Sequence, residues 1–235
     1  MLAKALLGAT AAGIEYVGGY VQGFAGTTSN VVISLTSLTG GIASAPAAGD
    51  LVIVYFGTGS DVNRDLVVAG YTEIVELYSN DIYDTNLAVA RKFMGGVPDT
   101  SFTLTGGTLD ASDAGAVAVQ VWRGVDAVTP LDVTRTTATG INSVLCDPPA
   151  ITPITPGAII VSGGAGAHDE EGSQTYSSSD LTSFISVGRS DTNSVTIGLG
   201  YHVWTSGAFN PAAFTFSGSD DTNFSWAAVT LALRP

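Results

Sequence analysis

The sequence predicts an all-β protein, an antiparallel, jelly-roll-like β-sandwich built from two related halves. Short apolar runs that alternate with period two recur along the chain, and Gly, Pro, Asn or Asp residues bound each of them. After residue 12, no window of a dozen residues keeps a helical period with good helix formers. The order of the runs in the first half is repeated in the second half. These three observations predict strands joined by tight turns, which also agrees with the 29 glycines.

Composition narrows the class of protein. The chain has 235 residues, of which 45% are hydrophobic, so it is long and apolar enough for a substantial core. Only 12% are charged, with eight Lys and Arg against 21 Asp and Glu, which gives a net charge of −13. Such a surface repels phosphate backbones, so no nucleic-acid partner is expected. No apolar run is long enough to span a bilayer, so no membrane partner is expected either.

The first thirteen residues form a segment of their own, a short N-terminal arm. The run is apolar and its only charge is Lys4, a weak match to a signal peptide whose hydrophobic region would be unusually short. An isolated helix of this length is marginal in water. We therefore expect Leu2, Leu6 and Leu7 to dock either on the sandwich or on a neighbouring subunit. The neighbour is favoured, which predicts a homo-oligomer or a larger assembly.

The strand predicted at residues 114–123 organises the first half. Val117, Val119 and Val121 fall on one face, and Ala118 and Trp122 fall on the other, so one face is buried and the other is at least partly covered. Residues 49–56 (GDLVIVYF) form an apolar run after Asp50, which is typical of a strand buried on both faces. Alternation predicts further strands at residues 14–24, 30–36, 71–78, 86–93 and 101–105.

The second half repeats this order, with pseudo-repeats at about residues 49–123 and 157–235. Residues 157–162 match 49–54 at an offset of 108, and the closing strands align at an offset of 112. That alignment predicts equivalent buried positions for Val119 and Leu231. Strands are also expected at residues 181–187, 195–204 and 213–217. No Ser-rich linker separates the halves, so one continuous sandwich over residues 14–235 is favoured over two domains.

The motifs of these strands resemble a β-sandwich module of uncharacterised tailed-phage virion proteins and related bacterial surface proteins. The resemblance covers about residues 14–235. It rests on AGDLVIV (48–54), GYTEIVEL (70–77), LAVARKF with VPDTSFTL (87–104), WRGVD with TPLD (122–132), PGAIIVS (156–162) and the closing ALRP (232–235). It implies a structural protein located in the virion, in a capsid decoration, collar, tail or fibre. Other virion proteins would then be its partners.

Motifs that would support catalysis are absent from the sequence. There is no GxSxG, HExxH or Walker loop, and GGAG at 163–166 is an incomplete dinucleotide pattern followed by acidic residues. His168 and His202 share no spacing that suggests a common metal. Cys146, the single cysteine, is interpreted as a buried hydrophobe on a strand at 143–146. The sequence therefore predicts a protein without enzymatic activity, catalytic residues or an organic cofactor.

Acidic turns offer the one metal-binding hypothesis. Ca²⁺ prefers several hard oxygen ligands, which Asp81 and Asp84 in one turn, or Asp220 and Asp221 in another, would provide. Neither turn has the spacing of an EF-hand. Solvated turn residues are the favoured alternative, and paired carboxylates in turns also make a hydrolase the weakest of the functions considered.

Aromatic residues support an alternative function. Tyr201 and Trp204 on one predicted strand, with Trp122 and Trp226 on the closing strands, would suit a sugar-stacking platform. That arrangement predicts a carbohydrate-binding or adhesive host-recognition module with a surface glycan as its partner. Packing of the same rings between sheets is the favoured explanation.

Overall fold

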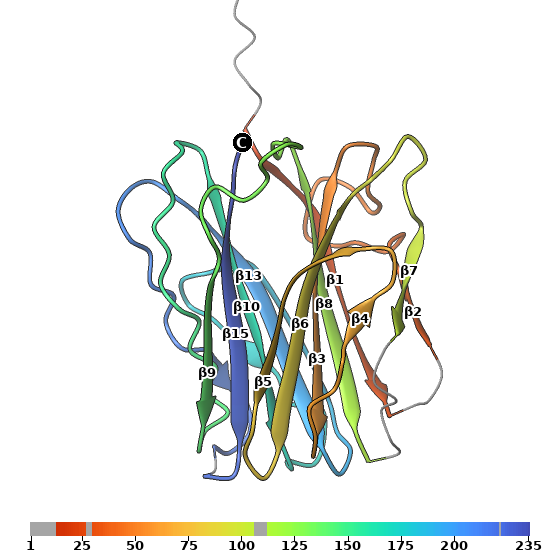
Figure 1. Cartoon of the computed structure of the whole chain (residues 1–235), viewed down its shortest axis with the longest axis vertical. Helices are drawn as coiled ribbons and strands as arrows, with labels where there is room; N and C mark the ends of the chain where they lie inside the picture. Colours follow the sequence, from red (N-terminus) through yellow and green to blue (C-terminus); the bar gives the residue numbers. More distant parts are fainter. Residues whose placement is uncertain (1–12, 27–29, 106–111, 221) are drawn as a thin grey trace, which may run out of the picture.

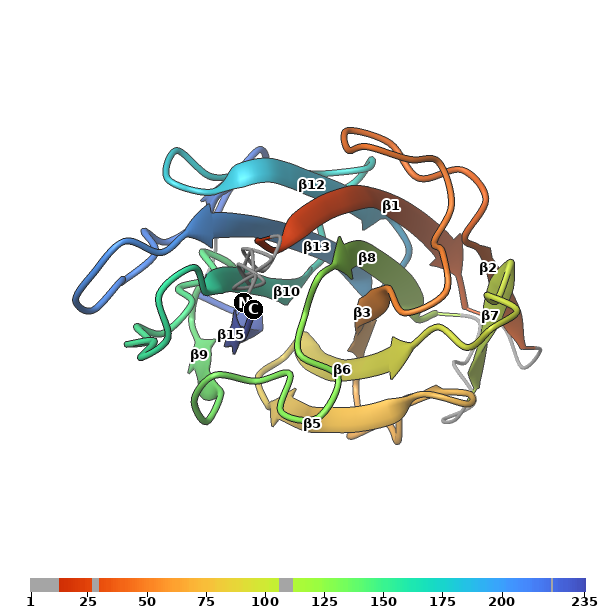
Figure 2. The ribbon, with the colours of Figure 1, turned by 90° about the horizontal axis from the view of Figure 1, so that it is seen from above.

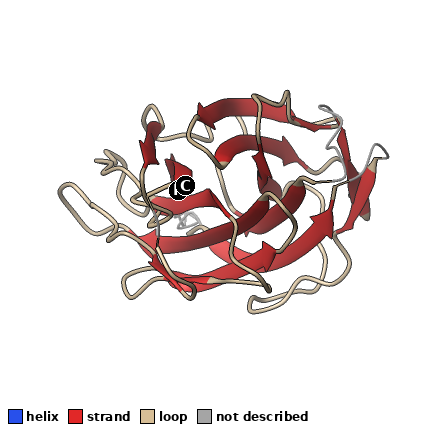
Figure 3. Cartoon of the chain, turned by 90° about the horizontal axis from the view of Figure 1, so that it is seen from below, coloured by secondary structure: helices blue, strands red, loops and turns tan. Residues whose placement is uncertain are grey.

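The computed structural model describes residues 13–26, 30–105, 112–220 and 222–235. In these ranges the chain forms strands and loops without a helix (Figure 3). The predicted all-β class, an antiparallel sandwich, is confirmed. Within the part of the chain that is described, no helix is long and apolar enough to cross a membrane.

Two five-stranded antiparallel sheets form the sandwich, one from each half of the chain (Figures 1 and 2). Sheet 1 has the order β1-β8-β3-β6-β5. Its strands are β1 (Glu15–Ala25), β3 (Leu51–Ser60), β5 (Thr72–Ser79), β6 (Asp84–Phe93) and β8 (Ala114–Arg123). Sheet 2 has the order β12-β13-β10-β15-β9. Its strands are β9 (Thr136–Ile141), β10 (Ile159–His168), β12 (Thr182–Arg189), β13 (Ser194–Val203) and β15 (Ser225–Leu233).

Two smaller sheets contribute to the outer faces of the sandwich. Side chains of β2 (Val31–Ser34), β7 (Ser101–Thr105) and β4 (Val67–Val68), which form a three-stranded sheet, share an apolar cluster with the outward face of sheet 1. Side chains of β11 (Tyr176–Ser177) and β14 (Thr215–Phe216) share another cluster with sheet 2. Both faces of the central strands are therefore covered, which explains their nearly uninterrupted apolar sequences.

The main core lies between the two large sheets and is built by alternation. On β3, Leu51, Ile53 and Tyr55 belong to this inner cluster, while Val52 and Val54 belong to the outer cluster of sheet 1. Burial of β3 on both faces, predicted from its sequence, is thus confirmed. The hydroxyl of Tyr55 donates a 3.0 Å hydrogen bond to the carbonyl of Val229 and so ties sheet 1 to sheet 2 through the core.

The register of the two sheets corrects the expected equivalence of Val119 and Leu231. Leu51 pairs with Trp122, and Ile159 pairs with Leu233, so the closing strands correspond at an offset of 111 rather than 112. Both predicted residues are fully buried, but Val119 lies in the outer cluster of sheet 1 and Leu231 lies in the inner cluster. A shift of one residue moves a strand side chain to the other face of its sheet.

Two local predictions in the second half are also wrong. Residues 143–146 do not form a strand, although Cys146 is buried and its carbonyl accepts a 2.8 Å hydrogen bond from the backbone N–H of Phe214. β10 continues through GGAG to His168 instead of ending near Ser162. A Cβ on Gly164 would lie 2.3 Å from Sγ of Cys146, so neighbouring side chains occupy the space above these glycines. The short strands β4, β9 and β11 were not predicted.

Candidate functional site

A network of polar contacts lies at the end of the sandwich where β15 finishes and the C-terminus lies (upper end in Figure 1). The loop of residues 124–135 crosses at this end from sheet 1, after β8, to sheet 2, before β9 (Figure 2). Its Gly124 has φ of 80°, a left-handed conformation that turns the chain out of β8. The WRGVD motif runs from the end of β8 into this crossing loop, which also carries the TPLD motif.

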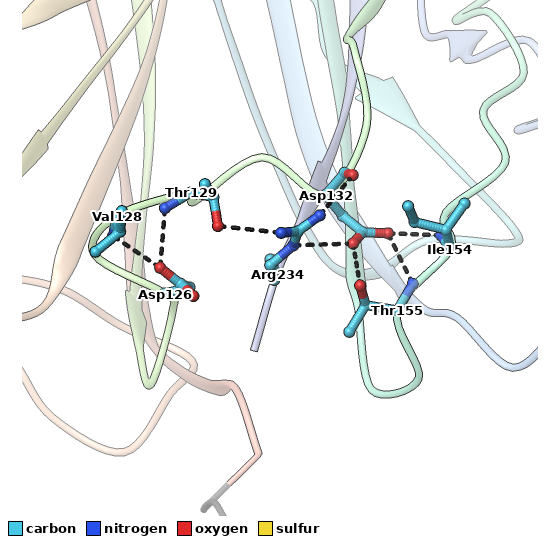
Figure 4. Close-up of polar contacts among 7 residues, drawn as sticks. All are labelled: Asp126, Val128, Thr129, Asp132, Ile154, Thr155 and Arg234. Carbon is cyan, nitrogen blue, oxygen red and sulfur yellow. Dashed lines mark hydrogen bonds and ion pairs between the residues drawn. The ribbon is translucent and has the colours of Figure 1, made fainter.

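Asp132 fixes the crossing loop to two other segments (Figure 4). Its carboxylate accepts hydrogen bonds from the backbone N–H groups of Ile154, at 2.6 Å, and Thr155, at 3.0 Å, and from the Thr155 hydroxyl. Nε of Arg234, next to the end of β15, lies 3.2 Å from Oδ1, the carboxylate oxygen that also accepts the bond from the Thr155 hydroxyl. Asp132 is only 4% exposed, so a carboxylate without these donors would be costly.

The electrostatics of the loop agree with this role. Burial alone would raise the pKa of Asp132, but the hydrogen bonds from Thr155, Ile154 and Arg234 outweigh burial and lower that pKa. Asp126 accepts backbone hydrogen bonds from Thr129 and Val128, which lower its pKa as well. Backbone bonds between Arg234 and both Asp126 and Pro130 complete the network. The crossing loop is therefore held along most of its length.

A hollow of about 200 Å³ opens beside the crossing loop. One wall is Ala127, Val128 and Pro130 of the loop. The other wall comes from the paired strands β5 and β6, whose lining residues are Thr72, Arg91, Lys92 and Phe93.

The two cationic residues of the hollow differ in their partners. Nζ of Lys92 lies 2.5 Å from the carboxylate of Asp99 and 5.6 Å from the ring centre of Tyr71. Arg91 is half-buried, and its guanidinium has no hydrogen bond or ion pair within the described residues. Arg91 is therefore the uncompensated cation of this site.

The predicted calcium ligands lie in turns that are engaged by protein donors. Asp84 is 1% exposed and accepts hydrogen bonds from the Asp81 N–H, at 2.8 Å, and from the Tyr78 hydroxyl. Asp81 accepts a hydrogen bond from the Asn142 N–H, and Asp220 accepts one from the Val144 N–H.

Asp221 lies outside the described residues, as do Leu2, Leu6 and Leu7 of the arm. Among the residues that are described, no three His, Cys, Asp or Glu side chains are grouped to hold a metal. Calcium binding stays a prediction, and a rise in melting temperature with millimolar Ca²⁺ is the measurement that tests it.

The predicted aromatic platform is divided among different parts of the structure. Trp122 and Tyr201 pack in the inner core with Tyr16, at ring-centre distances of 4.9 to 5.3 Å. Trp226 packs with the outer cluster of sheet 2, and Trp204 packs with a separate small cluster. These rings share no common surface.

The two histidines and the single cysteine pack against other side chains. His168 is fully buried, its Nε2 lies 2.9 Å from the Thr196 hydroxyl, and burial lowers its pKa to about 4. His202 lies on β13, and its ring stacks on that of Phe209 with ring centres 3.9 Å apart. Burial raises the pKa of the Cys146 thiol, so the thiolate that would react is disfavoured.

Sequence reasoning missed Arg91 as a candidate site residue. The available signal was a charged residue at an inward position of an alternating strand, between Val89 and Phe93.

Comparison of the chain with protein-family models, with curated proteins and with solved structures finds no match.

Proposed function

We propose that the protein is a non-enzymatic structural component of a tailed-phage virion, such as a capsid decoration, collar, tail or fibre protein. The supporting observation is what the polar residues of the resembling motifs do. Asp50 of AGDLVIV forms a bidentate ion pair with Arg123 of WRGVD, in which Nε and Nη2 of the guanidinium lie 2.9 and 3.0 Å from the two carboxylate oxygens. Asp132 of TPLD binds Arg234 of ALRP. The charged residues of these four motifs therefore hold strands and loops together, as expected of a building block.

Labelling of particles tests this proposal. Purified phage particles from the source of the gene would be incubated with a gold-conjugated antibody against residues 13–235 and imaged by electron microscopy. Label at one fixed position on the particle is the expected result. Particles that contain no copy of the protein by mass spectrometry, from a lysate that does contain it, would overturn the proposal.

The N-terminal arm provides a second test, because the proposal gives Leu2, Leu6 and Leu7 the role of anchoring the protein to a neighbouring subunit. Deletion of residues 1–12 should leave a folded domain that melts near the parent temperature but no longer joins its assembly. Lys4→Gln is the matched control, because it changes the arm without removing apolar surface. Truncated protein that still assembles normally contradicts the anchoring role, and loss of folding would assign the arm to the core.

A carbohydrate-binding or adhesive module is the second candidate function. The hollow beside Arg91 favours it, because a small concave site with one uncompensated cation and an apolar wall is suited to ligand recognition. The two candidates are compatible, since an exposed structural protein of a particle can also contact a surface glycan.

A further inference from the structure

We infer that the hollow beside the crossing loop binds one oxyanion group, a carboxylate, phosphate or sulfate, carried by a sugar-sized ligand, with Arg91 as its anchor. This inference concerns the isolated protein and does not depend on a place in a virion.

Two corners of the sandwich correspond to each other but are filled by different side chains. In the first corner, Tyr16 pairs with Trp122 on sheet 1, and Tyr201 faces them from β13 of sheet 2. Tyr201 pairs with Thr182 on the neighbouring strand. Three aromatic rings therefore fill this corner.

The second corner repeats this arrangement with different residues. Leu131 pairs with Leu233 on sheet 2, as Tyr16 pairs with Trp122 on sheet 1. Arg91 pairs with Thr72 on sheet 1, as Tyr201 pairs with Thr182. Two leucines and an arginine thus stand where the first corner has three rings, and the hollow of about 200 Å³ lies in this corner.

The guanidinium of Arg91 has the chemistry of an anion-binding group. An arginine is charged at all physiological pH values and presents its donors as a planar fork that matches a carboxylate or phosphate. Two other arginines of this end, Arg123 and Arg234, are paired with aspartate, whereas Nε of Arg135 in the crossing loop is buried without a hydrogen-bond partner among the described residues. Arg91 has no such partner among the described residues, and its half-buried position makes a bound counter-charge favourable.

The hollow has one wall that is fixed in place and a size that suits a small ligand. The network of Asp132 and Arg234 fixes the loop wall before any ligand binds, which reduces the entropy lost on binding. The hollow is smaller than the roughly 300–1,000 Å³ typical of pockets for drug-sized ligands, so it suits a single sugar unit. Phe93 and Val128 offer apolar surface for the carbon face of that unit, and Thr72 offers a hydroxyl.

Titrations followed by amide chemical shifts test the inference. The probes are sodium glucuronate, glucose 6-phosphate and inorganic phosphate, with neutral glucose as the control ligand, at about 0.15 M salt, where the Debye length of about 8 Å limits the influence of the net charge. We expect saturable shifts around Thr72, Arg91 and Val128 with the anions and none with glucose. A response to both sugar anions and not to free phosphate assigns an acidic sugar, and an equal response to phosphate assigns the anion alone.

Three variants distinguish a specific site from general charge. Arg91→Gln should weaken binding at least tenfold, whereas Arg189→Gln, the same charge change at the far end of β12, should leave it unchanged. Arg91→Tyr places in the second corner the residue type found at Tyr201 in the first. This variant should abolish binding, and it should fold even if Arg91→Gln fails to fold. No saturable response to any anion, or equal binding by folded Arg91→Tyr, would overturn the inference.

Discussion

At the scale of single residues, His168 shows how burial determines the charge of a side chain. Its ring lies between Phe216 and Phe224, at ring-centre distances of 4.9 and 6.1 Å, and no described residue forms a hydrogen bond with Nδ1. Such an environment favours the neutral imidazole. The residue therefore packs in the core as a neutral ring whose protonation is coupled to folding.

The pKa of His168 predicts a loss of stability in acid. The folded pKa is about 4 and the ordinary value is 6.5, so between these pH values only the unfolded chain binds the proton. The free energy of unfolding should therefore fall as pH decreases from 6.5 to 4, by roughly 3 kcal/mol from this residue. Chemical denaturation of the parent and of His168→Gln across this range measures the difference. Parallel pH profiles for the two proteins would contradict the prediction.

Asp132 gives a prediction about the site itself. Asp132→Asn removes the negative charge that accepts three hydrogen bonds from Ile154 and Thr155 and that pairs with the Arg234 guanidinium. The substitution should therefore lower the free energy of unfolding by about 1–3 kcal/mol. Asp61→Asn is the matched control, because Asp61 is exposed and accepts no hydrogen bond from a described residue. Urea denaturation of the three proteins at pH 7 is the measurement. Equal losses in both variants would show that the network does not fix the loop.

At the scale of elements, the two sheets use different chemistry at corresponding positions. Val54 pairs with Val119 in sheet 1, and the matching pair in sheet 2 is Ser162 with Thr230. The hydroxyls of that second pair lie 3.0 Å apart and are both fully buried. An apolar contact on one sheet is thus replaced by a hydroxyl pair on the other.

A double-mutant cycle tests whether this pair stabilises sheet 2. Thr230→Val alone, nearly isosteric, leaves the Ser162 hydroxyl buried without its partner and should cost about 1–2 kcal/mol. Adding Ser162→Ala removes the orphaned group, so the double variant should be less destabilised than the sum of the single variants, with a coupling of about 1 kcal/mol. Additive losses in thermal or urea unfolding would show that the two hydroxyls do not depend on each other.

At the scale of the whole molecule, the sheets are joined through a shared core and at both ends. The inner cluster takes side chains from both sheets. Opposite the Asp132 network, the fully buried Asp113 accepts hydrogen bonds from Asn193, at 3.1 Å, and from Ser60, at 3.2 Å, and pairs with Arg64. Each sheet therefore depends on the other to cover its inner face.

This dependence predicts that neither half folds alone. Residues 13–134 by themselves would expose the inner face of sheet 1, including Leu51, Ile53 and Tyr55. This fragment should therefore aggregate or give an NMR spectrum with poorly dispersed signals. Mixing this fragment with residues 135–235 from denaturant should restore a cooperative transition. A well-dispersed NMR spectrum and cooperative melting of either fragment alone would contradict the prediction and divide the chain into two domains.

The sequence by itself determined the class of fold and the position of most strands. Alternation in runs such as residues 101–105 is local information, and the bounds of β7 match it fully. The apolar character of the run at residues 49–56 also predicted burial on both faces, because no polar side chain interrupts it from Leu51 to Phe56. These properties depend on the period of side chains along one strand, which a sequence contains.

Tertiary structure decided the register, the extent of β10 and the site. An offset of 111 instead of 112 cannot be read from two apolar strands, because only pairing with β3 and β10 fixes which face each residue takes. GGAG has the composition of a turn, but it pairs with both β13 and β15 and so continues the strand, while Cys146 and Tyr176 occupy the space above its glycines. Arg91 and Val128 are far apart in sequence, and they line one hollow only because Asp132 and Arg234 hold the crossing loop against the end of the sandwich.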